Sequence, residues 1–173
     1  MKGPICPACG LSTFVEIGGG IERSETEGIE LYHPNIDARF GPMVDIVCDL
    51  EENDIPLHNV HAERIKMMHF LQHLGYLRAK YILKDCFRVL KSGGSLFLMV
   101  TDMKWQFAKS LEMNMKYEWT VGIWGEQEHR YDWHKWGYTF ESLKAALEEA
   151  GFINVQPRGY YNEWDMMLEA FKP

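Results

Sequence analysis

The sequence is poor in positive charge, in long apolar runs and in cysteine. Its 173 residues contain 18 Lys and Arg against 25 Asp and Glu, which gives a formal net charge of −7. A nucleic-acid partner usually requires a clustered basic surface, so that class of partner is not expected. No run of 18 apolar residues indicates a membrane span, and the first residues, "MKGPICPACG", lack the apolar core of a signal peptide. We therefore expect a cytoplasmic protein that binds neither nucleic acid nor membrane.

Only four cysteines are present, and one pair has the spacing of a metal knuckle. Cys6 and Cys9 lie in a Cys-Pro-Ala-Cys-Gly turn, which can supply half of a tetrahedral zinc site. The sequence has no second knuckle, so a metal completed by a second chain and a plain turn both stay open, and no metal ligand is assigned. His58 and His61 lie in a polar turn and are expected at the surface. Two cysteines are expected to be small core residues: Cys48 and Cys86.

The composition fits one compact domain, since 46% of the residues are hydrophobic and 13% are aromatic. Residues 1–11 are expected to form the knuckle or a tail, and residues 12–173 a single domain. Within that domain, residues 103–137 form an irregular insertion rich in Trp and Tyr.

Apolar runs and helical spacing predict strands that alternate with helices. Strands are expected over 12–17, 28–32, 45–50 and 95–101, and residues 64–71 read as a strand that runs into a helix. Helices are expected over 76–90, stopped by Gly93 and Gly94, and over 139–150, with Thr139 as N-cap and Gly151 as C-cap. Two further strands, 154–160 and 164–171, close the chain. This order predicts an α/β fold with a mostly parallel sheet and a terminal antiparallel hairpin, in which ligands bind at the carboxyl ends of the strands.

Six segments in order resemble the class I S-adenosylmethionine-dependent methyltransferases, and among them small, type-11-like members. The segments are "FVEIGGG", "GIEL", "VDIVCDLEENDIPL", "HFLQHL", "CFRVLKSGGSLFLMVTD" and "TFESLKAALEEAGF". The resemblance covers nearly the whole chain from Phe14 onward. It implies a three-layer Rossmann-like methyltransferase fold, with S-adenosyl-L-methionine as cofactor. The first helix region is shortened, because only "IERSETE" separates Gly20 from Gly28.

The resemblance also implies a cofactor site. A glycine-rich loop lets the backbone approach the ligand, and an acidic residue at the end of the second strand binds the ribose hydroxyls. That residue is Glu30, or Asp37 if the second strand is shifted. Asp49 would accept from the adenine amino group, with Leu50 against the ring. The implied cofactor-binding residues are Glu16, Gly18, Gly19, Gly20, Glu30, Asp49, Leu50 and His69.

The aromatic insertion is the expected acceptor site. His134, Asp132 and His73 are the candidate catalytic residues, because histidine titrates near neutrality and can take a proton. Arg130 is a further candidate for acceptor binding. Aromatic faces with polar groups suit a small polar acceptor, such as a saccharide hydroxyl. Two alternatives stay open: the aromatic residues form a satellite core or a homodimer face, or the chain binds S-adenosylmethionine without turnover.

Overall fold

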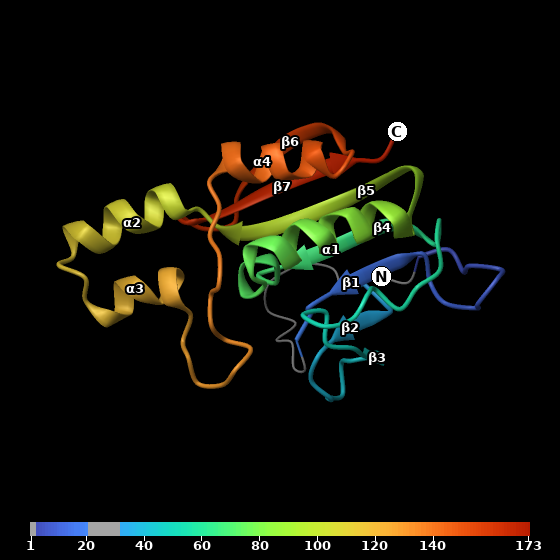
Figure 1. The fold of residues 1–173 in the computed structure, drawn as a ribbon, viewed down its shortest axis with the longest axis horizontal. Coiled ribbons are helices and arrows are strands. Elements are labelled where there is room, and N and C mark those ends of the chain that lie inside the picture. Colours follow the sequence, from blue (N-terminus) through green and yellow to red (C-terminus); the bar gives the residue numbers. More distant parts are fainter. Residues whose placement is uncertain (1–2, 21–31) are drawn as a thin grey trace.

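The computed structural model describes residues 3–20 and 32–173. These residues form a seven-stranded sheet in the order β3-β2-β1-β4-β5-β7-β6 (Figure 1). The first five strands are parallel, and β7 runs antiparallel to both β5 and β6. The mostly parallel sheet with a C-terminal antiparallel hairpin is therefore confirmed. The strands are β1 (Phe14–Ile17), β2 (Asn35–Asp37), β3 (Ile46–Val47), β4 (Ala62–Met68), β5 (Leu90–Thr101), β6 (Ile153–Tyr160) and β7 (Asp165–Phe171).

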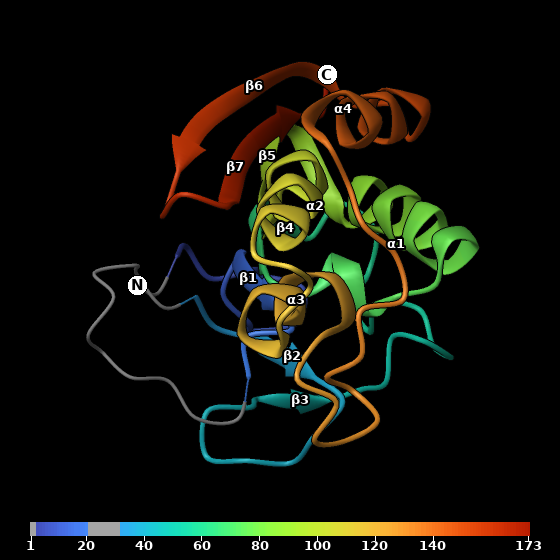
Figure 2. The ribbon, with the colours of Figure 1, turned by 90° about the vertical axis from the view of Figure 1, so that its left-hand side faces the viewer.

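The helices occupy two places relative to the sheet. The helices are η2 (Leu71–His73, a 3-10 turn), α1 (Tyr76–Val89), α2 (Met103–Glu112), α3 (Tyr117–Trp124) and α4 (Phe140–Glu149). Helices α1 and α4 cover one face of the sheet, whereas α2 and α3 project beyond the carboxyl ends of the parallel strands (Figure 2). In the described ranges the opposite face of the sheet carries no helix. The three-layer fold was expected to have helices on both faces, and the described helices cover only one. None of the described helices has the length and apolar character needed to cross a membrane.

The core lies between the sheet and α1 with α4. Alternate residues of neighbouring strands, such as Val15, Ile65 and Leu96, are fully buried together with Ile82 and Leu83 of α1. Successive residues of a strand point to opposite faces, so one face of each strand supplies the core. The apolar runs of the sequence become core strands for this reason.

The opposite face of the sheet carries charged residues in its centre. Glu16 and Lys66 lie opposite each other in the β1–β4 register. The Lys66 Nζ is 3.2 Å from the Glu16 Oε2, and both side chains are almost fully buried. A buried carboxylate and ammonium need such a partner, because isolated charges are costly to remove from water.

The second strand differs from its expected position. Residues 28–31 lie outside the described residues, and Tyr32 is not in a strand. The strand that pairs with β1 is β2, at Asn35–Asp37. A three-residue strand with Ile36 as its one apolar residue leaves too short a pattern to recognise in the sequence.

The segment expected to be irregular, 103–137, contains α2 and α3. Asp102, at the end of β5, is the N-cap of α2, and its Oδ1 accepts from the Lys104 backbone N–H at 3.0 Å. Asp102 also accepts from the Tyr160 hydroxyl at 2.8 Å. The abrupt acidic end of this apolar strand is therefore a helix cap. Gly93 and Gly94 lie inside β5, at an irregularity of the β4–β5 register where Gly93 has a φ of 76°.

Helix α4 begins as the sequence predicts. The Thr139 hydroxyl accepts from the Ser142 backbone N–H, and the Ser142 hydroxyl accepts from the Thr139 N–H at 2.9 Å. This reciprocal pair satisfies two donors that the helix itself leaves free. The helix ends at Glu149, before Gly151 with a φ of 105°.

We predict that Thr139→Ala lowers the free energy of unfolding by about 1 kcal/mol, because the first turn of α4 loses its cap. Chemical denaturation followed by circular dichroism measures this change. Ser92→Ala, at an exposed position, is the control and should leave the midpoint unchanged. Equal midpoints for Thr139→Ala and the wild type would contradict a role for the cap.

Candidate functional site

Several predicted site residues lie together at one edge of the sheet. Parallel strands end at the same edge, and in such sheets ligands bind there. Residues that end or directly follow β1, β2, β3 and β4 therefore share this edge, which faces α2 and α3. They are Gly18, Gly19, Gly20, Asp37, Asp49 and His69.

The glycine-rich loop packs closely against its own chain. Gly18 and Gly20 have φ values of 67° and 78°, which side-chain-bearing residues rarely adopt. A Cβ on Gly18 would collide with the ring of Phe70, and one on Gly19 would collide with the Asn35 amide. The loop therefore needs glycine for internal packing, and a substitution at Gly18 would disturb the fold as well as any ligand.

Asp37 lies at the carboxyl end of β2, the place where the resemblance puts the ribose-binding acid. Its Oδ2 accepts from the Gly20 N–H at 3.1 Å, and its Oδ1 accepts from the Arg39 N–H at 2.9 Å. The Arg39 Nε also lies 3.4 Å from the Oδ1, which leaves the Oδ2, with one described donor, as the oxygen with capacity for a ligand hydroxyl. Glu30, the other candidate, lies outside the described residues.

The residues after β3 have partners within the chain. The Asp49 carboxylate is 2.7 Å from the Arg130 guanidinium and also accepts from the Tyr131 hydroxyl at 3.3 Å. Arg130 thus contacts the predicted cofactor edge, although it was expected on the acceptor side. Leu50 is only 2% exposed and belongs to the hydrophobic core, which leaves its side chain little surface for a ligand.

Glu16 lies apart from this edge, on the sheet face, where it pairs with Lys66. Its Oε2 also accepts from the Tyr32 N–H at 3.1 Å. The described contacts of Glu16 are therefore structural, and its predicted contact with a cofactor stays a prediction.

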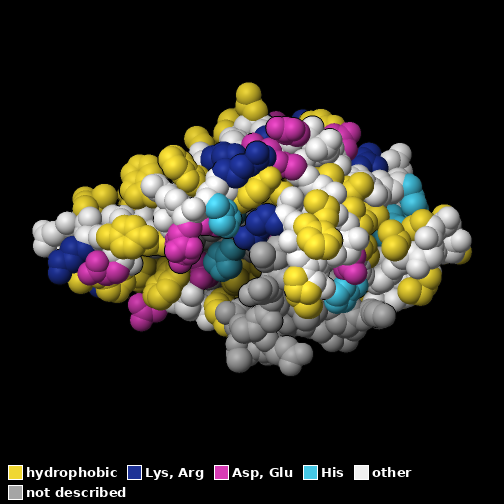
Figure 3. Space-filling view, turned by 90° about the horizontal axis from the view of Figure 1, so that it is seen from below, with side chains coloured by type: hydrophobic (Ala, Val, Ile, Leu, Met, Phe, Trp, Pro, Cys, Tyr) yellow, Lys and Arg dark blue, Asp and Glu magenta, His cyan; other side chains and the backbone are white. Residues whose placement is uncertain are grey.

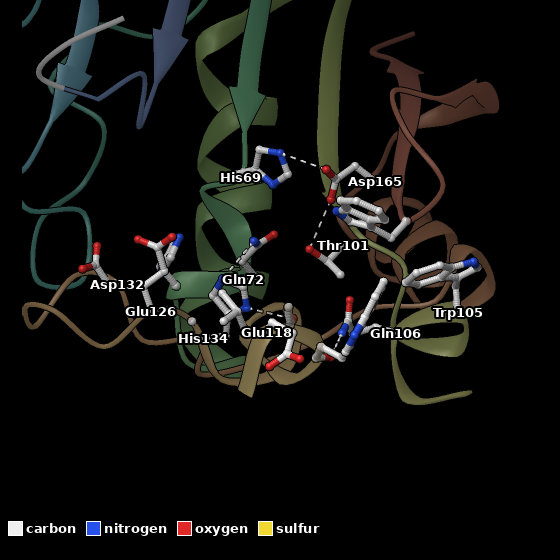
Figure 4. Close-up of a pocket in the computed structure, with 16 residues that line it drawn as sticks. His69, Gln72, Thr101, Trp105, Gln106, Glu118, Glu126, Asp132, His134 and Asp165 are labelled. Carbon is white, nitrogen blue, oxygen red and sulfur yellow. Dashed lines mark hydrogen bonds and ion pairs between the residues drawn. The ribbon is translucent and has the colours of Figure 1, made fainter. Parts of the chain in front are cut away.

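A cavity of about 460 Å³ opens beside the carboxyl edge, between the ends of β4 and β5 and the helices α2 and α3 (Figure 4). It has polar and aromatic walls. The Trp105 and Trp164 rings, 5.5 Å apart between centroids, form one wall. The residues used below that line it are His69, Gln72, His73, Thr101, Asp132, His134 and Asp165.

His69 and Asp165 form an imidazole–carboxylate pair in this cavity. The His69 Nε2 lies 3.5 Å from the Asp165 Oδ2, and the Asp165 Oδ1 accepts from the Thr101 hydroxyl at 3.3 Å. His69 has a φ of 49°, unusual for a residue with a side chain. A carboxylate beside an imidazole can hold the ring in one orientation.

Sequence reasoning missed Asp165. A signal was present, because Asp165 begins the terminal strand β7, which is antiparallel to β5. Because β7 runs opposite to β5, the first residue of β7 lies beside the last residue of β5, at the carboxyl edge of the parallel strands. An acidic residue at the start of the last strand could therefore have been placed at the site.

His134 and His73 lie side by side in the cavity wall, with ring centroids 4.9 Å apart. The His134 Nδ1 donates to the Gly122 carbonyl at 3.0 Å, so its Nε2 accepts from the Gln72 amide at 3.1 Å. Burial lowers the pKa of His134. Burial, with the neighbouring His134, lowers the pKa of His73 to about 4. Both rings are therefore neutral at pH 7, and burial makes protonation of either ring less favourable than in water.

Asp132 also lines the cavity, but its carboxylate has a partner. The His129 Nε2 lies 3.0 Å from the Asp132 Oδ1. The same His129 nitrogen is 3.1 Å from the Arg39 guanidinium. Acidic, basic and histidine side chains gather where the α2–α3 projection meets the sheet, seen from below in Figure 3. The structure thus brings His134, His73 and Asp132 to one cavity with His69.

Comparisons with known proteins identify the fold. No family model and no curated protein matches the sequence. Solved structures do match, at low identity. An S-adenosylmethionine-dependent methyltransferase from Archaeoglobus fulgidus is 17% identical, with a TM-score of 0.63, and the match covers 92% of this chain and 85% of that one. One from Methanosarcina mazei is 16% identical, with a TM-score of 0.58 and coverage of 92% and 91%.

A longer protein shares the same fold. Human N-acetylserotonin methyltransferase, solved in complex with S-adenosylmethionine, is 14% identical, with a TM-score of 0.60. The match covers 92% of this chain but 47% of that one. The chain likewise spans 43% and 57% of two other solved structures that it matches. These likenesses show that the chain has the fold of the class I S-adenosylmethionine-dependent methyltransferases.

The lowered pKa of His73 predicts a loss of stability in acid. Between pH 6.5 and about 4 the unfolded chain takes up a proton at His73 that the folded chain does not, so the free energy of unfolding falls as the pH falls. On this basis, lowering the pH from 8 to 5 should cost the wild type about 2 kcal/mol more than it costs His73→Gln.

Chemical denaturation of both proteins at pH 8 and pH 5 measures this difference. The pH 8 values are the reference, because the imidazole is then neutral in both states. An equal loss in the two proteins would contradict the buried, neutral state of His73.

Proposed function

We propose that this chain is an S-adenosylmethionine-dependent methyltransferase that transfers a methyl group to a small polar acceptor. The observation that carries the proposal is the shared edge of the sheet. A glycine-rich loop after β1, the acid Asp37 at the end of β2 and the acid Asp49 after β3 lie along it. The cavity lined by His69 and His134 opens beside the same edge.

The side chains at this edge suit the cofactor. Asp37 can accept from ribose hydroxyls, and Asp49 can accept from an adenine amino group. The loop of Gly18, Gly19 and Gly20 offers backbone with no side chains to block a bulky ligand. When bound, S-adenosylmethionine supplies the activated methyl group.

The cavity supplies groups that can orient an acceptor and take its proton. His69 is the best placed, because its ring faces the cavity and its Nε2 lies 3.5 Å from the Asp165 carboxylate, which can orient it. His134 is neutral, and its Nε2 can exchange the Gln72 amide for an acceptor hydroxyl. His73 and Asp132 then position His134 and the loop that carries it.

The walls of the cavity favour a small polar acceptor. Trp105 and Trp164 present apolar faces, while Thr101, Gln72 and the histidines present hydrogen-bonding groups. Flat faces with polar edges of this kind recognise ligands that are apolar above and below and hydroxylated at the rim. A saccharide hydroxyl is one acceptor of this class.

A second candidate function, cofactor binding without turnover, is favoured by one contact. Arg130 and Tyr131 occupy the Asp49 carboxylate that would face the adenine. Where this contact persists, the cofactor would lack the Asp49 acceptor and bind more weakly, which would lower turnover. A cytoplasmic location is proposed for either function.

We predict that Asp37→Asn weakens binding of S-adenosylmethionine about tenfold or more, because the ribose hydroxyls lose a charged acceptor. Isothermal titration calorimetry with S-adenosylmethionine and S-adenosylhomocysteine measures the affinity. Glu112→Gln is the matched control, since Glu112 is exposed near the end of α2 and pairs only with Lys109 in the described structure. No detectable binding to the wild type at millimolar cofactor would overturn the proposed function.

We predict that Asp165→Asn lowers turnover about 100-fold or more while cofactor affinity stays within about threefold, since general-base catalysis contributes factors of this order. Turnover is measured as S-adenosylhomocysteine formed with a panel of hydroxylated metabolites that includes monosaccharides. Glu112→Gln again serves as control. Cofactor binding with no turnover on any acceptor would favour the second candidate function, whereas parallel losses of binding and turnover would assign Asp165 to the cofactor side.

A further inference from the structure

Two cysteines and two histidines meet at the end of the sheet opposite the candidate site. Cys6 and Cys9 precede β1, and His58 and His61 precede β4. One possible ligand atom from each of the four residues lies within 4.8 Å of the other three. The sequence left both a metal completed by a second chain and a plain turn open, and the structure places two histidines of the same chain beside the two cysteines.

The distances between these atoms match a tetrahedral metal site. The Cys6 Sγ is 3.2 Å from the His58 Nε2, the Cys9 Sγ is 3.6 Å from the His61 Nδ1, and the two nitrogens are 3.3 Å apart. Tetrahedral zinc, with bonds of about 2.3 Å to sulfur and about 2.0 Å to nitrogen, would separate sulfur from nitrogen by about 3.5 Å and the nitrogens by about 3.3 Å.

The second nitrogen of each ring is held by a backbone carbonyl. The His58 Nδ1 lies 2.8 Å from the Asn59 carbonyl, and the His61 Nε2 lies 2.9 Å from the Ser12 carbonyl. A carbonyl only accepts, so each neutral ring carries its proton on that nitrogen and turns the lone pair of the other nitrogen toward the cluster. Two lone pairs face each other, an arrangement that a cation stabilises, and metal-binding histidines commonly have such carbonyl partners.

The backbone turn that carries the cysteines is already formed. The Gly10 N–H donates to the Cys6 carbonyl at 2.9 Å, and the Cys6 N–H donates to the Leu11 carbonyl at 2.7 Å. Gly10 has a φ of 75°, which suits glycine. This turn presents both thiols on one side, toward the histidines.

The burial of the cluster also differs from the expectation. His61 is fully buried and His58 is exposed, whereas both were expected at the surface. Cys6 is buried as well. The sequence around His61 does not predict its burial, because its contact with Cys9 comes from a segment 52 residues earlier.

We propose that Cys6, Cys9, His58 and His61 bind one structural zinc ion. Two thiolates with two imidazoles form a donor set that zinc prefers, and a full set of four protein ligands leaves no position for a substrate. The ion ties the segment before β1 to the segment before β4. The site is independent of the proposed methyl transfer, because it lies at the other end of these strands.

Metal content and thermal stability of the full chain test this proposal. Inductively coupled plasma mass spectrometry of the protein purified under reducing conditions should give one zinc per chain. Cys9→Ser and His58→Ala, both at exposed ligand positions, should each lose at least nine-tenths of this zinc. The matched controls Cys48→Ser and His33→Ala lie outside the cluster and should keep it.

Two further measurements keep the test decisive if a variant folds poorly. A strong zinc chelator should lower the Tm of the wild type and leave the Tm of Cys9→Ser unchanged. Cobalt added to the stripped wild type should give the visible absorption of tetrahedral, thiolate-bound cobalt. Three results would overturn the proposal. The wild type could contain no zinc and show no such cobalt spectrum, or Cys6 and Cys9 could form a disulfide in place of a metal site. Both ligand variants could also retain one zinc per chain.

Discussion

The parallel pairing of β1 with β4 is the constraint on which both ends of the molecule depend. In this register Phe14 lies beside Arg64 and Ile17 lies beside Met67, so the two strands run in the same direction and their ends lie within two residues of each other. Segments that precede them in the chain must meet at one end of the sheet, and segments that follow must meet at the other. The Cys and His residues of the cluster are neighbours for the first reason, and Gly18 and His69 for the second.

The two ends of the sheet differ in whether their side chains leave space for a ligand. At the amino end every ligand atom of the cluster faces the other three, so the arrangement is closed and serves to hold the strands. At the carboxyl end the histidines and Asp165 face a cavity, and His69 holds an uncommon backbone conformation with a φ of 49°. Uncommon conformations persist only where the surrounding structure enforces them, and the buried β1–β4 pair provides that support.

The sequence predicted the order of the elements because strand and helix patterns are local. Apolar runs placed Gly19, Asp49 and His69 after the ends of predicted strands, and in the structure they follow β1, β3 and β4. Their contact with a cofactor stays a prediction. Contacts between distant segments were not predictable in this way, and the His61 partner across 52 residues has no local signature. Asp165 could have been placed at this edge from the start of the last strand, but its pairing with His69 could not. Helix α3, "YEWTVGIW", was missed because its aromatic and β-branched residues are weak helix formers, and packing against α2 decides its structure.

The loop between α3 and α4 connects the carboxyl edge of the sheet to the cavity beside it. Arg130 reaches Asp49, while the Lys135 N–H donates to the Gln72 carbonyl at 2.8 Å, and His134 lies between them in the chain. The Arg130 side chain is 69% exposed, and exposed ion pairs contribute only about 0 to 1 kcal/mol. Under the proposed function, an adenine amino group can therefore replace Arg130 at Asp49 at little cost. Gln72 also holds the His134 ring. Release of Arg130 from Asp49 would therefore free one end of the segment from Arg130 to His134 while the other end stays held. Under the proposed function, cofactor binding and the placement of His134 are thus coupled through these five consecutive residues.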